Sequence, residues 1–218
     1  IYYAVTGGRT NTGPGNKAMR STSLFSSQDL KIWKYEHNFM KNECFLPPGE
    51  DASCPYFWPI GNRYIFLFFS HTTGSQYLLG DYNKEEHCFY PTFHGRFNFM
   101  SFLPGGVHAP SATSDGEGGV IVIHNMHTGK KSPGWRGITT LPRKLTLDKC
   151  DTINIQPYGD YKSLRTHHQH IDKTHLPANK EIIIDNIQGN ALEIKAEINI
   201  KSSPMIEMNV LRSPDKEE

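Results

Sequence analysis

The sequence lacks several features that would assign its class at once. Four cysteines, Cys44, Cys54, Cys88 and Cys150, show no C-x-x-C spacing, which excludes a zinc knuckle and a dithiol redox motif and argues against a disulfide framework. We expect free and mostly buried thiols. The longest apolar runs, such as residues 64–69, are far shorter than the roughly 20 residues of a transmembrane helix, and no signal-like segment opens the chain. The formal net charge of +1 gives no electrostatic case for nucleic acid. Neither a membrane nor a nucleic acid is therefore an expected partner.

Helical periodicity is almost absent, and the pattern present instead has period two. Segments rich in aromatic and β-branched residues predict strands over residues 1–6, 21–26, 64–69, 76–81, 120–125, 137–143, 181–184, 192–200 and 205–211. The loops between them are short and rich in Gly, Pro, Asn and Asp. Strands that recur this densely predict an all-β fold, as a sandwich, barrel or propeller, and argue against a βαβ fold.

Three local patterns favour a propeller among the all-β folds. Residues 26–33 close a strand, turn on a polar cluster and return with Trp33, which we expect to be a large apolar plug. Gly61 and Asn62 form a turn between two apolar strands, and residues 114–119 do the same before the next strand. Each unit resembles one hairpin of a four-stranded blade, although the repeat is too degenerate to be identified from its period alone.

The composition changes along the chain. Residues 144–175 are polar and rich in His, Asp and Lys, and they separate an aromatic N-terminal part from an Ile-rich C-terminal part. We therefore expect a domain boundary in this stretch. The chain opens as if in the middle of a strand and stops just after another, which indicates a fragment of a longer protein.

Six segments, in this order and spacing, resemble glycoside hydrolase family 32, the invertase, levanase and inulinase group. They read SLFSSQDLKIWKYE, SCPYFWPIGNRYIFLF, GGVHAPSATSDGEGG, GWRGITTLPRKLTL and ALEIKAEINI followed by NVLRSP. The most specific is GWRGITTLPRKLTL, which is similar to the last-blade signature of the family. The resemblance implies a partial five-bladed β-propeller over residues 1–147, without its first blade, then a linker over 148–175. The start of a C-terminal β-sandwich would follow over 176–218.

The resemblance also implies an activity on β-fructofuranosides such as sucrose, levan or inulin. Family members use a retaining mechanism, in which one carboxylate attacks the anomeric carbon and a carboxylic acid about 5 to 5.5 Å away protonates the leaving oxygen. The nucleophile belongs to an Asn-Asp-Pro segment and a stabilising Asp to an Arg-Asp-Pro segment. This sequence contains neither. We expect both to lie before residue 1, and we expect the 218-residue piece alone to be inactive and poorly stable because a missing blade exposes strand edges.

The third family motif, Glu-Cys-Pro, carries the acid/base, and here it reads Ser53-Cys54-Pro55. A serine hydroxyl cannot act as a general acid near neutral pH. Asp51, two residues upstream and on the same face of an extended segment, is the candidate acid/base, with Glu50 behind it. Ser53, Cys54 and Pro55 stay candidates for contacts with the substrate.

Other candidate binding residues come from later segments. His108, in a Val-His-Ala-Pro-Ser run, falls where the family often has an aromatic before Ala-Pro, so it could bond a fructosyl hydroxyl or tune a neighbouring acid. Trp135 could stack on a sugar, as could Trp58, although core packing is expected for both. His124 and His127 point to opposite faces if they lie on a strand, which argues against a shared metal.

Two alternatives to a β-fructofuranosidase stay open at this point. One is a carbohydrate-binding relative that has lost acid catalysis, for which Ser53 is the telling residue. The other is a different five-bladed glycosidase, such as an arabinosidase. A Ser-His-Asp hydrolase is disfavoured because no G-x-S-x-G segment occurs. No cofactor and no metal is expected, a carbohydrate is the expected partner, and both a cytoplasmic and a secreted protein agree with the sequence.

Overall fold

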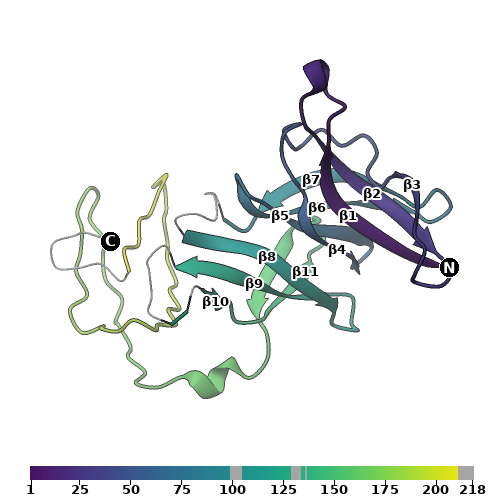
Figure 1. Cartoon of the computed structure of the whole chain (residues 1–218). Helices are drawn as coiled ribbons and strands as arrows, with labels where there is room; N and C mark the ends of the chain where they lie inside the picture. The colour runs from purple at the N-terminus through teal and green to yellow at the C-terminus, as the bar shows by residue number, and fades with distance from the viewer. Residues whose placement is uncertain (99–104, 129–133, 136, 211–218) are drawn as a thin grey trace. The chain divides into compact units, whose positions relative to one another are not determined.

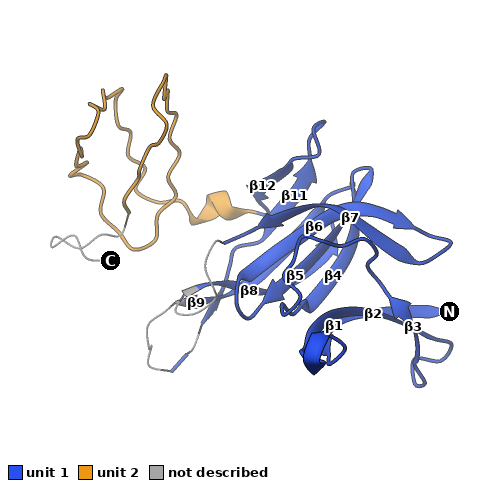
Figure 2. Cartoon of the chain, turned by 90° about the horizontal axis from the view of Figure 1, so that it is seen from above, with its two compact units in different colours: residues 1–159 blue, residues 160–218 orange. Residues whose placement is uncertain are grey.

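Residues 1–159, the first of two compact units, form three antiparallel sheets (Figure 1, Figure 2). The structure is a computed structural model, and it describes residues 1–98, 105–128, 134–135 and 137–210. The strands are β1 (Tyr2–Thr10), β2 (Met19–Ser27), β3 (Lys34–Asn38), β4 (Ser53–Ile60), β5 (Arg63–Ser70), β6 (Gly74–Asn83), β7 (Cys88–Arg96), β8 (Gly105–Ser114), β9 (Val120–Thr128), β10 (Ile138–Thr139), β11 (Arg143–Leu147) and β12 (Ile153–Pro157). Helical structure in these ranges consists of two 3-10 turns, η1 (Pro14–Asn16) and η2 (Tyr161–Leu164). None of the described helices has the length and apolar character to cross a membrane. The predicted all-β class is confirmed.

Each sheet is a meander, and consecutive strands are neighbours except β10 and β11, which both pair with β9. The first sheet has the order β1-β2-β3 and the second β4-β5-β6-β7. In the third, β9 pairs with β8 along one edge and with both β10 and β11 along the other, and β12 follows β11. Antiparallel neighbours that follow one another in the chain need only short connections, so this order agrees with the short polar loops of the sequence.

The second sheet is covered on both faces, and β5 shows this in its sequence. Phe66 and Phe68 belong to an apolar cluster shared with the first sheet, whereas Ile65 and Leu67 belong to one shared with the third. All four residues are fully buried. Because side chains alternate along a strand, an unbroken apolar run is expected only where both faces are covered. Shortening either phenylalanine to alanine would cost roughly 3–5 kcal/mol of stability.

The two apolar clusters together hold the three sheets against one another. The first consists of Leu24, Phe39, Leu46, Ala52, Phe66, Phe68, Leu78 and Phe89. The second consists of Ile60, Ile65, Leu67, Leu79, Val120, Val122 and Leu145.

The turns predicted from the sequence are largely confirmed. Gly61 and Asn62 connect β4 to β5, and residues 115–119 connect β8 to β9. Residues 28–33 connect β2 to β3, but Trp33 is not the expected apolar plug, because 38 % of it stays exposed. The predicted strand over 137–143 is wrong as a single element. Pro142 has no amide hydrogen to donate to a ladder, and the chain forms β10 before it and β11 after it.

The second unit, residues 160–218, begins at η2 and contains no strand in the part that the structure describes. Strands predicted over 181–184 and 192–200 are therefore wrong for this chain, as is 205–210, while residue 211 lies outside the described residues. No β-sandwich is seen over residues 176–210, the described part of the domain predicted for 176–218. These segments keep most of their Ile and Leu side chains exposed. Alternation marks the face of a strand that seeks burial, but a strand also needs a partner for its backbone groups.

The cysteines are free, as expected, but mostly not buried. Cys88 is buried in β7, whereas Cys44, Cys54 and Cys150 are exposed. The expectation of mostly buried thiols is wrong because three of the four lie in loops or at the bulge at the start of β4.

Candidate functional site

β4 and β8 begin with the same backbone device. In β4 the register with β5 shifts between Ser53 and Tyr56, and in β8 the register with β9 shifts between His108 and Pro110. Each bulge contains a non-glycine residue with positive φ directly before a proline, Cys54 at 51° and Ala109 at 41°. A bulge bends its strand and re-aims the residue before it. Ser53 and His108 are the residues placed in this way.

Asp51 lies just before β4 and is the centre of the site. Only 11 % of its side chain is exposed. The Ser53 hydroxyl donates to its Oδ2, and His71 Nδ1 lies 2.6 Å from the same oxygen. The backbone N–H of His71 donates to Oδ1 at 3.1 Å, and Arg9 Nη2 lies 3.7 Å from Oδ1. Ser53 and Asp51 therefore lie together, as the extended segment predicted.

These contacts set the charge of Asp51. Burial raises the pKa of its carboxyl, but the hydrogen bonds from Ser53 and His71 outweigh burial and hold the pKa below the ordinary value. Asp51 is thus ionised at neutral pH. A buried carboxylate with this many donors is well suited to hold and orient a cationic or hydrogen-bonding partner.

Glu50 is buried behind Asp51, and 4 % of the residue is exposed. It accepts hydrogen bonds from the hydroxyls of Thr72, at 3.4 Å, and Thr73, at 2.8 Å. Glu50 thus holds the turn after β5, which carries His71.

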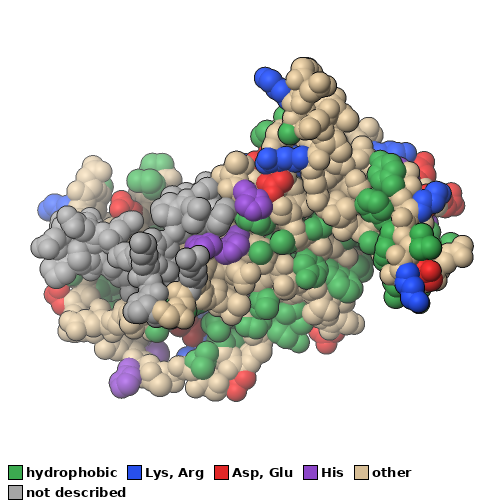
Figure 3. All heavy atoms as spheres, viewed as in Figure 1, with side chains coloured by type: hydrophobic (Ala, Val, Ile, Leu, Met, Phe, Trp, Pro, Cys, Tyr) green, Lys and Arg blue, Asp and Glu red, His purple; other side chains and the backbone are tan. Residues whose placement is uncertain are grey.

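The start of β8 continues the site. The ring centroid of Phe69 lies 4.6 Å from that of His71 and 5.6 Å from that of His108, and His108 stacks on His127 at 4.6 Å. Burial, together with the charge of His127, lowers the pKa of His108, so His108 is neutral at neutral pH. Figure 3 shows histidine, acidic and basic side chains beside one another on one face of the molecule.

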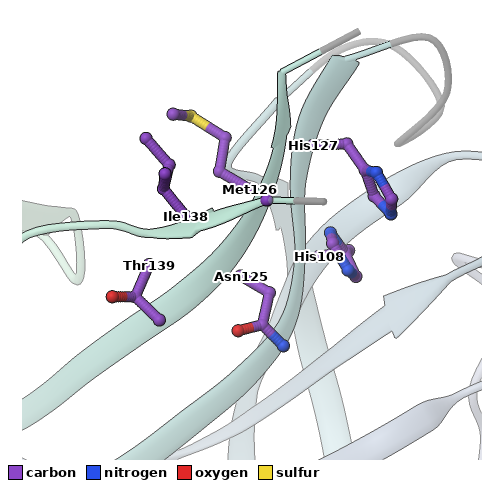
Figure 4. Close-up of a pocket in the computed structure, with 7 residues that line it drawn as sticks. His108, Asn125, Met126, His127, Ile138 and Thr139 are labelled. Carbon is purple, nitrogen blue, oxygen red and sulfur yellow. The ribbon is translucent and has the colours of Figure 1, made fainter. Parts of the chain in front are cut away.

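A pocket of about 580 Å³ adjoins this cluster. It is lined by His108, Asn125, Met126, His127, Gly137, Ile138 and Thr139. In Figure 4 the rings of His108 and His127 lie side by side, while Met126 and Ile138 point to the other side of the strands. The pocket is large enough for a sugar ring and offers it both polar and apolar contacts.

His124 lies on the same strand as His127 but on the opposite face, as predicted. It is 1 % exposed, and burial lowers its pKa to about 4. Its ring packs on Phe97 with centroids 4.9 Å apart. Within the described ranges no group of three or more His, Cys, Asp or Glu is arranged to hold a metal ion.

The two candidate tryptophans differ. Trp58 packs against the second apolar cluster and donates from Nε1 to the Ala112 carbonyl at 3.2 Å, so the core role expected for it is confirmed. Trp135 lies between β9 and β10 with 48 % exposed, so the expected core role is wrong for it. Trp135 stays a candidate for stacking on a sugar, and the partly buried Pro55 and the exposed Cys54 stay candidate contacts at the start of β4.

β1 packs closely against the chain segment that carries Asp51 and Ser53. A Cβ atom on Gly7 would lie 1.7 Å from the carbonyl oxygen of Ala52, so only glycine allows β1 to approach the segment between Asp51 and Ser53 this closely. Gly8, the next residue, has open space around it.

Sequence reasoning missed His71, Arg9 and Phe69. A signal for His71 was present, because the two-residue turn at Gly61 fixes the register of the β4–β5 hairpin. Ser53 pairs with Phe69 at the end of this ladder, which brings residue 71 beside residue 51. Nothing in the sequence pointed to Arg9, which reaches the site from another sheet.

Relatives of the chain are enzymes that act on sucrose-type substrates, according to their names. A sucrose-6-phosphate hydrolase from Vibrio alginolyticus is 25 % identical, over 94 % of this chain and 44 % of that protein. One from Zymomonas mobilis is 26 % identical, over 75 % of this chain and 34 % of that protein. The chain thus spans less than half the length of the curated relatives it matches.

Solved structures show the same fold. A GH32 beta-fructofuranosidase from Bombyx mori aligns with a TM-score of 0.59 at 22 % identity, over 77 % of this chain and 37 % of that one. The sucrose-6-phosphate hydrolase from Lactobacillus gasseri aligns with a TM-score of 0.58 at 18 % identity, over 76 % and 36 %. The model of the glycosyl hydrolases family 32 N-terminal domain matches residues 2–157. The chain therefore belongs to glycosyl hydrolase family 32.

Proposed function

We propose that the full-length protein is a β-fructofuranosidase that hydrolyses sucrose-type substrates by the retaining mechanism. The observation that carries this proposal is a buried, hydrogen-bonded carboxylate, Asp51, at the start of β4 in a chain that belongs to family 32. The family model extends over all three sheets, and the names of two relatives add a phosphorylated sucrose to the candidate substrates.

The proposed architecture is that of the family. The three sheets correspond to successive blades of a five-bladed propeller, with β4 and β8 as the first strands of their blades. The propeller expected over 1–147 then extends to the end of β12 at Pro157, and the linker expected over 148–175 begins only after it. The support is the meander order of each sheet and the fold likeness to solved family members.

The proposed acid/base machinery is Asp51 together with the groups bonded to it. Asp51 is the nearest carboxylate to Ser53, the position at which the family motif has Glu. Ser53, Cys54, Pro55, His108 and Trp135 are the proposed substrate contacts. Their support is the shared position of the two bulges and the pocket beside His108.

The experiment is an assay of the purified full-length protein for release of fructose from sucrose, sucrose 6-phosphate, inulin and levan. Asp51→Asn should lower turnover by roughly 10²- to 10⁴-fold, the usual contribution of general acid/base groups. Glu85→Gln, which changes an exposed carboxylate in the β6–β7 loop, serves as the matched control and should leave turnover unchanged. Wild-type protein that releases fructose from none of the four substrates would contradict the proposal.

A second candidate, carbohydrate binding without hydrolysis, is favoured by one observation, the serine at position 53. Calorimetry with the same four substrates distinguishes the two. Binding without release of fructose supports the second candidate, and release of fructose excludes it.

A further inference from the structure

We propose that His71 is the residue that donates the proton to the leaving oxygen, with Asp51 as the carboxylate that positions it. This inference rests on the proposed function, hydrolysis of β-fructofuranosides. It assigns a catalytic role to a residue outside the Ser53-Cys54-Pro55 motif.

The geometry holds the His71 ring in one orientation. Its Nδ1 lies 2.6 Å from Oδ2 of Asp51, and its backbone N–H donates to Oδ1 of the same carboxylate at 3.1 Å. Phe69 packs against the ring at 4.6 Å. Yet 58 % of the His71 side chain is exposed, so a substrate can reach the ring edge. A proton donor needs this combination of fixed orientation and access.

The charge of Asp51 suits it to position His71, and not to donate the proton itself. An ionised Asp51 has no proton to give to a leaving group, but its negative charge stabilises an imidazolium beside it. Asp51 also stays anionic because Ser53 and the backbone N–H of His71 donate hydrogen bonds to it. Histidine ordinarily changes charge between about pH 5 and 8, which is where a general acid for neutral pH is needed.

Other ionisable groups around His71 come from several elements. In the described part of the chain they are Arg9 on β1, Glu50 and Asp51 before β4, His108 on β8 and, behind it, His127 on β9. One of these groups, Arg9, is a cation, and two of them, Glu50 and Asp51, are carboxylates. His108 is neutral at neutral pH and adds little charge there.

Ser53 does not compete for the proton. Both Ser53 and His71 bond to Oδ2 of Asp51, so the serine is placed beside the carboxylate and not at the end of a Ser-His-Asp relay. The hydroxyl helps to keep Asp51 ionised, and this makes Ser53 a second positioning residue.

The chemistry balances in two steps. A carboxylate nucleophile attacks the anomeric carbon, the bond from that carbon to the leaving oxygen breaks, and the proton on Nε2 of the imidazolium passes to the leaving oxygen. Water then attacks the anomeric carbon, the bond to the carboxylate breaks, and a water proton returns to Nε2. The hydrogen on Nδ1 stays on the His71 ring throughout, hydrogen-bonded to the ionised Asp51, so no other reactant is needed.

The test uses full-length protein with three variants, His71→Gln, Asp51→Asn and His37→Gln. Glutamine at 71 keeps a donor toward Asp51 but cannot carry the proton, and His37 is a partly buried histidine on β3, in the first sheet. Each variant is assayed on sucrose and on an aryl β-fructofuranoside whose good leaving group needs little protonation, over a range of pH.

We expect His71→Gln to lower kcat on sucrose by about 10²- to 10⁴-fold and on the aryl fructoside by less than about tenfold. Wild-type kcat/KM on sucrose should fall as the pH rises and the acid loses its proton, and His71→Gln should abolish this fall. Asp51→Asn should keep a fall with rising pH, because His71 still carries the proton in that variant. His37→Gln should match the wild type.

If His71→Gln still hydrolyses the aryl fructoside, the variant protein is folded. If it loses activity on both substrates while its thermal unfolding matches that of the wild type, the proposal is contradicted. Turnover of sucrose by His71→Gln within about threefold of the wild type would overturn the assignment of His71 while leaving the proposed function intact. If Asp51→Asn rather than His71→Gln abolishes the fall at high pH, Asp51 itself is the acid. A wild type inactive on both substrates would remove the proposed function and this inference together.

Discussion

The first residues of β4 and of β8 enter their sheets through the same kind of bulge, yet they carry different chemistry. One start holds the ionised Asp51 within reach of Ser53, His71 and Arg9, and the other holds His108 neutral against His127. The bulge decides where a side chain points, whereas its neighbours decide its charge. The same backbone geometry thus places an anion at one strand start and a neutral imidazole at the other.

The largest expected effect removes the support that β1 gives to the start of β4. Gly7→Ala places a methyl group on the carbonyl of Ala52, which cannot give way without moving Asp51. We expect a loss of roughly 3 kcal/mol of unfolding free energy or more, at the upper end of overpacking costs. Urea titration of the full-length protein measures it.

Gly8→Ala is the matched control, because its added methyl group meets open space, and it should change stability by less than about 0.5 kcal/mol. Equal stability of the two variants would show that β1 does not brace this strand start.

The second prediction concerns the pH dependence of stability and distinguishes the start of β8 from the start of β4. Burial holds the pKa of His124, which pairs with Pro110 beside the β8 bulge, at about 4 against 6.5 in the unfolded chain. The unfolded chain therefore binds a proton that the folded chain does not. The contribution of neutral His124 to the free energy of unfolding is complete above pH 6.5. It is lost as the pH falls from 6.5 through 4, by up to about 3 kcal/mol.

His124→Leu should remove most of this loss between pH 6.5 and 4, measured as the urea midpoint at each pH. The lowered pKa of Asp51 acts only as the pH falls through and below its ordinary value of 3.8, so the variant should keep that acid limb. An unchanged slope between pH 6.5 and 4 in the variant would contradict the role of His124.

A third and smaller effect tests how β4 and β8 are held together. Trp58→Phe keeps most of the apolar contact with the second cluster but removes the Nε1–H donor to the Ala112 carbonyl. We expect a loss of about 1 kcal/mol. Trp33→Phe, at a half-exposed residue in the β2–β3 loop, is the control and should change stability little. If both substitutions lower the free energy of unfolding equally, the hydrogen bond from Trp58 to Ala112 adds nothing to stability.

The smallest effect is a gain at the bulges themselves. Cys54→Gly and Ala109→Gly replace residues at positive φ, where glycine has no Cβ to strain the backbone. Each should stabilise the protein by about 0.5 to 1 kcal/mol after the added freedom of the unfolded chain is subtracted. Ala112→Gly, elsewhere on β8, should instead destabilise. A loss at both bulges, seen as a lower urea midpoint, would mean that their side chains matter more than their strain.

Much of the first unit could be predicted because its signals are local. The two-residue turn at Gly61 and the apolar run of β5 fixed a hairpin and its buried faces. β4 and β8 were harder to recognise, since Pro55 and Pro110 look like strand breakers unless a bulge takes them up.

The second unit shows where local signals fail. Residues 192–200 alternate as a strand should, yet they form no ladder in the described residues, because a ladder depends on a partner that alternation does not name. The exposure of Trp33 and of Trp135 was missed for a related reason. Aromatic character shows that burial would be favourable, and the neighbours decide whether it occurs.

By itself, the sequence determined the all-β class, the hairpin turns, the family and the placement of Asp51 beside Ser53, since all of these depend on short-range pattern and motif. Only the tertiary structure brought Arg9 and His108 to the β4–β5 hairpin that places His71 beside Asp51, because these two residues come from other sheets and no periodicity records which sheets meet. The charge of Asp51 depends on the groups that contact it. A carboxyl at position 51 could have been acid or anion, and the donors around it made it an anion.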